Sequence, residues 1–351
     1  MVVRRSGTPL RKNMETLFVK AARGKTTEKP VWMMRQAGRY LPEYRDLRNR
    51  FPDFLSFVKN PEAAAEATLQ PVKRFDLDAA ILFSDILVTL PCMGFNLKFV
   101  PGKGPVIENP VRSISDVQNL QDIDFEKSLD YTAKAIKLVR KNLSESKSLL
   151  GFVGGPLTIA SYAIEGGSSK DLRRTKALFY NDPQTYKLFL ERIARLTGEY
   201  LAFQAKCGAD ALVIMDSWAG LLAKSDYEQI ARPYTETVIS IVHKFTDVPI
   251  IHYANGASHL TESIMTLNAN VFGVDHRSDL PALFRKYPGK IFQGNLDQAI
   301  LFTNPAQIKF HTNRILECAK NRPHIMNLGH GILPETPLEN VRAFIDAVHE
   351  F

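Results

Sequence analysis

Short apolar runs recur at intervals along this 351-residue chain, and helical segments lie between them. The runs are continuous rather than alternating, which is typical of strands buried on both faces of a parallel sheet. Eight strands, each followed by at least one helix, are the number that closes a (β/α)8 barrel. The eight runs are 31–34, 78–85, 149–153, 211–215, 248–251, 271–274, 290–293 and 325–328.

We therefore predict an α/β chain that folds as a (β/α)8 TIM barrel, a single catalytic domain over residues 13–351. An extra N-terminal helix is expected from Met14 to Arg23, with Asn13 as its cap. Residues 95–121 contain Pro101-Gly-Lys-Gly-Pro and indicate a hairpin-like insertion after the second strand. An open doubly wound sheet is the alternative, but no G-x-G-x-x-G follows the first apolar run, so the dinucleotide-binding fingerprint is missing.

Long helices are expected from Asp182 to about Cys207, where Gly208 ends the helix, and from Asp226 to Phe245. Residues 1–12 form a basic leader without an apolar core, which we expect to be poorly ordered and which is not a secretory signal. No apolar stretch has the length needed to cross a bilayer, so no membrane association is expected.

The charge balance favours an acidic partner. The formal net charge is +8 at pH 7, and it is spread along the chain rather than gathered in a tail, so nucleic acid is not expected as a partner. The three cysteines are far apart, which indicates a reducing compartment. A cytoplasmic location follows, and an organelle stroma or matrix is the alternative if the basic N-terminus is a targeting remnant.

Four arginines, Arg35, Arg39, Arg45 and Arg48, follow the first apolar run. The loops that follow strand ends are the usual place for binding residues. Guanidinium groups bind carboxylates or phosphates through paired N–H donors. Gly38 and Pro42 are expected to keep the turn irregular, because glycine tolerates positive φ and proline has a fixed φ. A solvated surface face is the alternative. The segment is interpreted as a receptor for a strongly anionic small molecule.

Polar side chains follow the other runs, at the strand ends where barrels carry their chemistry. The candidates are Asp85, Tyr162, Ser217 and His330. Asp85 ends the most apolar run, where a carboxylate facing a dry pocket can stabilise positive charge. A helix cap or an arginine partner is the alternative for Asp85, and a structural turn is the alternative for His330. No metal site is predicted, because the histidines and cysteines lack zinc spacing.

Five segments together resemble the uroporphyrinogen decarboxylase family, and the likeness runs in order from about Asn13 to the C-terminus. The segments are Trp32-Met-Met-Arg-Gln-Ala-Gly-Arg-Tyr-Leu-Pro-Glu-Tyr-Arg, Ala80-Ile-Leu-Phe-Ser-Asp-Ile-Leu, Tyr162-Ala-Ile-Glu-Gly-Gly, Gln293-Gly-Asn-Leu-Asp and Asn327-Leu-Gly-His-Gly-Ile-Leu-Pro. The resemblance implies a carboxy-lyase of haem biosynthesis with a (β/α)8 fold. Such an enzyme uses no cofactor, is usually a homodimer, and converts the four acetate side chains of uroporphyrinogen III to methyl groups, giving coproporphyrinogen III.

The resemblance also implies residue roles. Arg35, Arg39 and Arg48 would bind substrate carboxylates, and the backbone of Gln36, Ala37 and Gly38 would line the same loop. Asp85 would accept the pyrrole N–H groups, while Tyr162, Ser217 and His330 would complete the binding surface. Asp85 and Arg35 are the predicted catalytic residues, although either an arginine or a bound water could deliver the proton. A corrinoid-linked methyltransferase of the same superfamily and a non-enzymatic anion-binding barrel are the alternatives.

Overall fold

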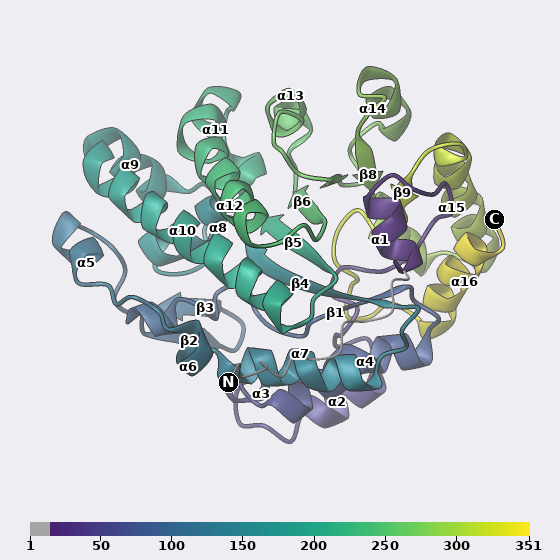
Figure 1. Ribbon diagram of the computed structural model, residues 1–351, viewed down its shortest axis with the longest axis horizontal. Helices are drawn as coiled ribbons and strands as arrows, with labels where there is room; N and C mark the ends of the chain where they lie inside the picture. Colours follow the sequence, from purple (N-terminus) through teal and green to yellow (C-terminus); the bar gives the residue numbers. More distant parts are fainter. Residues whose placement is uncertain (1–14) are drawn as a thin grey trace, which may run out of the picture.

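The computed structural model describes residues 15–351; the predicted leader and Asn13 lie outside the described residues. The fold is α/β, with a curled parallel sheet of seven strands at the centre (Figure 1). Neighbouring strands follow the order β1-β4-β5-β6-β7-β8-β9, so each new strand is added beside the previous one. The strands are β1 (Ala79–Ile81), β4 (Ser148–Gly154), β5 (Ala211–Asp216), β6 (Ile250–Ala254), β7 (Val271–Gly273), β8 (Ile291–Gln293) and β9 (His324–Ile325).

The sheet is buried on both faces, as the continuous apolar runs predict. Along β5, Leu212 and Ile214 belong to the large core cluster that includes the surrounding helices. Ala211 and Val213 belong instead to a smaller cluster on the opposite, inner face, together with Phe18 of α1. Successive side chains of a strand point to opposite faces, so strand position decides which of the two cores a residue joins.

The first apolar run, 31–34, forms a bridge rather than a strand. Val31 pairs in parallel with Met326, and the Val31 carbonyl accepts a hydrogen bond of 2.9 Å from the Asp78 amide. The run therefore lies between the residue that precedes β1 and the residue that follows Ile325 of β9. It is short because the Met34 amide donates to the Asn327 side chain, which takes the place of a strand partner.

Helices surround the sheet: α4 and α7 lie along one side, α10 and α12 along another, and α15 and α16 along a third (Figure 1). The α-helices are α1 (Leu17–Ala22), α2 (Pro42–Arg48), α3 (Phe54–Val58), α4 (Pro61–Arg74), α5 (Ile114–Gln118), α6 (Phe125–Ser128), α7 (Asp130–Asn142), α8 (Pro156–Glu165), α9 (Arg173–Asn181), α10 (Pro183–Cys207), α11 (Lys224–Ile230), α12 (Arg232–Phe245), α13 (Thr261–Ile264), α14 (Leu280–Lys286), α15 (Pro305–Ala319) and α16 (Leu338–His349). Short 3-10 helices are η1 (Pro91–Met93), η2 (Ala219–Leu221), η3 (Ser258–Leu260) and η4 (Gln298–Phe302).

The longest predicted helix is confirmed, because α10 runs from Pro183 to Cys207 with Asp182 as its N-cap. Two other helix predictions are corrected. The N-terminal helix begins at Leu17, and the Thr16 hydroxyl accepts from the Val19 amide as its cap. The helix predicted from Asp226 to Phe245 is two helices, α11 and α12, because the backbone leaves helical geometry at Ala231 and a proline follows within the first turn.

The predicted insertion after the second apolar run is a hairpin. Strands β2 (Leu97–Val100) and β3 (Gly104–Ile107) pair antiparallel and form a separate two-stranded sheet. The hairpin lies at the lower left in Figure 1, and its strand β2 contacts α3. Among the helices of residues 15–351, none combines the length and the apolar character that a membrane span requires.

Candidate functional site

The loop after the first apolar run is shaped by Arg35. Arg35 has a φ of 62°, in the left-handed region that non-glycine residues seldom adopt. Gly38, expected to supply the positive φ, does not adopt it. A Cβ at this position would lie 3.0 Å from the Arg35 carbonyl oxygen, so a larger residue would have to displace that carbonyl slightly. The loop closes when the Tyr40 hydroxyl donates to the Gln36 carbonyl at 2.8 Å. Pro42 then begins α2, where it occupies the first turn.

The arginines of this loop differ in their partners. Arg35 and Arg39 are exposed, and neither guanidinium forms an ion pair with any carboxylate of the described residues. Arg48 donates to the Phe51 carbonyl at 2.8 Å, and Arg45 donates to the Arg39 carbonyl at 2.7 Å. Two guanidinium groups four positions apart in the sequence, both without an ion pair among the described residues, are available to an anionic ligand.

Gln36, Ala37 and Gly38 connect these arginines. The Gln36 side chain is fully buried; it donates to the Ala79 carbonyl at 3.1 Å and accepts from the Met33 amide at 3.2 Å. Its side chain therefore fixes the loop to the start of β1, and the residue as a whole is buried. Ala37 and Gly38 are partly exposed.

Asp85 lies four residues after the end of β1. One carboxylate oxygen accepts from the Leu87 amide at 2.8 Å, and the other accepts no hydrogen bond from the described residues. Burial raises the pKa of Asp85 to about 6, while the Leu87 amide and the nearby Arg35 guanidinium act in the opposite direction. Above pH 6 the site therefore contains an ionised carboxylate with an open oxygen next to a free guanidinium.

Tyr162 of α8 and His330 complete this arrangement. Burial raises the pKa of Tyr162, whose phenol also lies within the electrostatic reach of Asp85 and Arg35. Burial, together with the nearby Arg35 guanidinium, lowers the pKa of His330 to about 4, so the imidazole is neutral at pH 7. We call these four residues, Arg35, Asp85, Tyr162 and His330, the strand-end site. Ser217 is partly exposed and follows β5, and it forms no hydrogen bond with the described residues.

Tyr253, Asp275 and Arg277 also surround His330, and the sequence predictions did not include them. The Tyr253 hydroxyl donates to the Gly329 carbonyl at 2.9 Å and lies 3.3 Å from Nδ1 of His330. Asp275 is 1% exposed and pairs with Arg277 at 2.9 Å. Asp275 directly follows the 271–274 run and so stands at a predicted strand end, but the sequence assigned it no role in the site.

Trp218 is a further residue that the sequence predictions missed. Its indole stacks on the Tyr162 ring with centroids 4.0 Å apart and an interplanar angle of 25°. The segment Asp216-Ser217-Trp218 follows a predicted strand, but nothing in the sequence indicates that the indole reaches across to α8. The stack joins the loop after β5 to the strand-end site.

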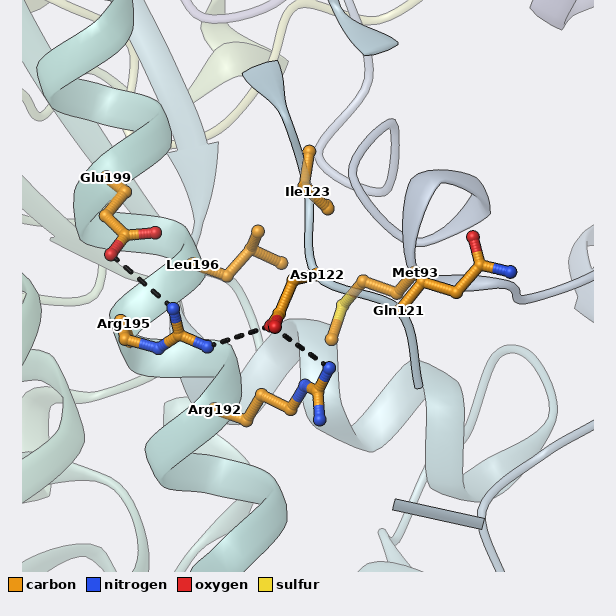
Figure 2. A pocket seen from close by; sticks show the side chains of 8 residues that line it. All are labelled: Met93, Gln121, Asp122, Ile123, Arg192, Arg195, Leu196 and Glu199. Atoms are coloured by element: carbon orange, nitrogen blue, oxygen red, sulfur yellow. Dashed lines mark hydrogen bonds and ion pairs between the residues drawn. The ribbon is translucent and has the colours of Figure 1, made fainter. Parts of the chain in front are cut away.

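A separate pocket lies between α10 and the segment that follows α5 (Figure 2). Its charges are already paired: Asp122 contacts Arg192 and Arg195 at 3.2 Å each, and Arg195 contacts Glu199 at 3.7 Å. None of the predicted site residues lines this pocket. Within residues 15–351, no group of three or more histidine, cysteine, aspartate or glutamate side chains is arranged to hold a metal ion.

Solved structures share this α/β fold. A methyltransferase from Methanosarcina mazei superimposes with a TM-score of 0.78 over 95% of this chain and 97% of its own, at 18% identity. A putative vitamin-B12 independent methionine synthase from Listeria monocytogenes gives a TM-score of 0.58 over 92% and 96% of the two chains, at 12% identity. At these identities the likeness establishes the fold alone.

Sequence relatives define the family. A protein from Roseiflexus sp. (strain RS-1), named uroporphyrinogen decarboxylase, is 46% identical over 92% of this chain and 94% of its own. A protein of the same name from Prochlorococcus marinus (strain MIT 9312) is 40% identical over 95% and 97%. Residues 13–351 match the family described as uroporphyrinogen decarboxylase (URO-D), and the chain belongs to that family.

Proposed function

We propose that this protein is a carboxy-lyase that decarboxylates the four acetate side chains of uroporphyrinogen III and yields coproporphyrinogen III. In each step the C–C bond to the carboxylate breaks, carbon dioxide leaves, and a proton completes the methyl group. Family membership supports the reaction. The observation that carries the proposal is the Asp85 carboxylate, which has one open oxygen and lies near the unpaired Arg35 guanidinium.

The electrons of the broken bond need an acceptor. If a pyrrole carbon is protonated first, the ring becomes a cation that receives the electron pair, so the reaction proceeds without pyridoxal or thiamine. The exocyclic carbon then takes up a proton to become the methyl group, and the ring carbon loses the proton it gained, so one proton is consumed for each carbon dioxide released. Asp85 is ionised at neutral pH, accepts the pyrrole N–H groups and stabilises this cation, and its partly buried position strengthens the effect. Arg35 or a bound water delivers the proton.

The remaining predicted residues receive binding roles in this proposal. Arg35, Arg39 and Arg48 bind carboxylates of the octa-acid, and the backbone of 36–38 lines the same loop. Tyr162, Ser217 and His330 complete the surface. A neutral His330 is consistent with this role, because it donates or accepts a hydrogen bond without adding charge.

The scaffold proposed for this chemistry is a single (β/α)8 barrel over residues 13–351. In this barrel the 31–34 run is the first of eight strands. The hydrogen bonds of this run to Asp78 on one side and Met326 on the other support closure. We further propose a homodimer in a cytoplasmic, reducing compartment. The three free thiols, Cys92, Cys207 and Cys318, are consistent with that compartment.

The test is turnover of freshly reduced uroporphyrinogen III under anaerobic conditions, followed by oxidation of the products and separation by carboxylate number. We expect intermediates with seven, six and five carboxylates and a final product with four. Recovery of unchanged octa-acid from folded protein would reject the function. Sedimentation velocity measures the proposed dimer independently of activity.

A further inference from the structure

We propose that Trp218 is a positioning residue for Tyr162, and that a buried hydrogen bond between Thr158 and Asp216 sets Trp218 in place. The proposal deepens, and rests on, the function proposed above. It concerns three residues outside the strand-end site that the decarboxylation chemistry does not use directly. Their contacts connect β5, the loop that follows it, and one face of α8.

The stack between Trp218 and Tyr162 is the tightest ring pair among the described residues. The two centroids lie 4.0 Å apart, and the remaining ring pairs have separations of 4.7 Å or more. A pair of rings this close restricts the relative orientation of the two rings. The indole therefore limits where the Tyr162 ring can turn, and the phenol stays near Asp85 and Arg35.

Thr158 attaches the backbone of Trp218 to the same helix that carries Tyr162. The Trp218 amide donates to the Thr158 hydroxyl at 3.2 Å. Thr158 and Tyr162 are four residues apart on α8 and so share one face of the helix. Trp218 thus contacts α8 at two points one turn apart, through its backbone at Thr158 and through its ring at Tyr162.

Asp216 decides the direction of the hydrogen bonds at Thr158. The Thr158 hydroxyl donates to Oδ1 of Asp216 at 2.9 Å. A hydroxyl has one proton, and an ionised carboxylate only accepts, so the Thr158 oxygen is left to accept from the Trp218 amide. Asp216 is fully buried and faces away from the strand-end site, on the same side of β5 as Leu212 and Ile214.

The surroundings of Asp216 are built tightly around this contact. A Cβ added at Gly155 would lie 2.7 Å from the Asp216 carboxyl carbon, so the carboxylate packs directly on the N-cap residue of α8. The partial positive charge of that helix end favours the ionised form. Oδ2 of Asp216 has no hydrogen-bond partner among the described residues. Burying a carboxylate oxygen without a partner costs free energy, so packing alone does not account for an aspartate at this position.

The test compares Thr158→Val with Thr158→Ser, which keeps the hydroxyl. Thr197→Val is the matched control: Thr197 is also a fully buried helical threonine, but its hydroxyl donates to the Ile193 carbonyl within α10. With reduced uroporphyrinogen III, we expect Thr158→Val to lose about 10- to 100-fold in kcat with KM changed by less than about two-fold. Thr158→Ser and Thr197→Val should retain wild-type kcat.

An optical measurement reports the stack without turnover. The chain has two tryptophans, Trp32 and Trp218, so a Trp32→Phe background leaves Trp218 as the single indole. In that background Thr158→Val should weaken the near-ultraviolet circular dichroism of the stacked indole and shift its fluorescence to longer wavelength. Thr158→Ser and Thr197→Val should preserve both signals.

The outcomes separate the two proposals. An unchanged indole signal and unchanged kcat in a folded Thr158→Val variant would overturn the positioning role, as would equal losses in Thr158→Val and Thr197→Val. Folding is checked by far-ultraviolet circular dichroism. An inactive wild-type protein would reject the decarboxylase function, while loss of the indole signal specific to Thr158→Val would still support the positioning of Trp218.

Discussion

Asp85 and Asp216 provide a comparison between two regions of the molecule. Both carboxylates lie at the carboxyl ends of strands of one sheet, and burial raises the pKa of each to about 6. Asp85 has an oxygen open to a ligand and lies near Arg35. The Asp216 side chain faces the helices instead and accepts a hydrogen bond from the Thr158 hydroxyl. A raised pKa therefore does not identify a catalytic residue; the face of the sheet and the open hydrogen-bonding capacity do.

The sharpest test of this comparison replaces each carboxylate by its amide. Asp85→Asn should lower kcat about 100- to 1000-fold with the fold retained, because an amide accepts N–H groups but stabilises a cation poorly. Asp216→Asn should lower kcat by about tenfold or less, since it acts only through Thr158 and Trp218. Steady-state kinetics with reduced uroporphyrinogen III measure both. Equal losses in the two variants would remove the distinction between the regions.

The neighbour of Asp85 provides the next largest effect. Arg35→Ala should lower kcat/KM about 10- to 100-fold, with KM raised and kcat lowered, because affinity and orientation are lost together. Arg50→Ala is the control, since Arg50 is an exposed arginine shortly after the same loop. If Arg35→Ala matched Arg50→Ala in kcat/KM, Arg35 would not belong to the site.

The pH dependence of kcat/KM assigns the titrating group. Asp85 acts in its ionised form, so kcat/KM should fall about tenfold per pH unit as the pH drops below about 6. The Asp216→Asn variant should keep this acid limb, because Asp85 is intact. If kcat/KM of Asp216→Asn stays constant from pH 7 to pH 5, the loss of activity of the wild-type protein at low pH belongs to Asp216 instead.

The smallest expected effect is on stability. Asp216 binds its proton more tightly in the folded than in the unfolded chain, so its ionisation lowers the unfolding free energy as pH rises from about 4 to about 6. This loss of unfolding free energy persists above pH 6 and amounts to at most about 3 kcal/mol, the equivalent of the pKa shift. Urea unfolding of wild type and Asp216→Asn at pH 4 and pH 7 measures it. The difference between the two proteins isolates Asp216, because buried His252 and His324 titrate in the opposite sense in both. A difference that is equal at both pH values would contradict the shift.

Much of the fold was predictable because local patterns encode it. Continuous apolar runs predicted all seven strands of the parallel sheet, and the segment with Pro101 predicted the hairpin. The first run pairs with the sheet only through a bridge at Val31, since the Asn327 side chain accepts from the Met34 amide. No local pattern reports such a contact between residues 293 positions apart.

The candidate site was predictable to a similar extent. Arg35, Asp85, Tyr162 and His330 end apolar runs or follow them closely, and the structure places them near one another. The positive φ at Arg35 was missed because left-handed backbone is expected at glycine, and Gly38 of the same loop does not adopt it. Trp218 was missed for the same reason, since its partner lies on a helix that precedes it by more than fifty residues.

The contact between Arg35 and Gly331 has a consequence for biosynthesis. A Cβ at position 331 would come within 2.8 Å of Cγ of Arg35, and the Ile332 amide donates to the Met34 carbonyl at 3.0 Å. Residues 34–35 and 331–332, from opposite ends of the chain, therefore pack against each other. On the ribosome, the arginine loop emerges early but lacks its C-terminal partner, Gly331, until translation is almost complete. A nascent chain that stalls before residue 331 should hold most of the sheet and still bind no polyacid.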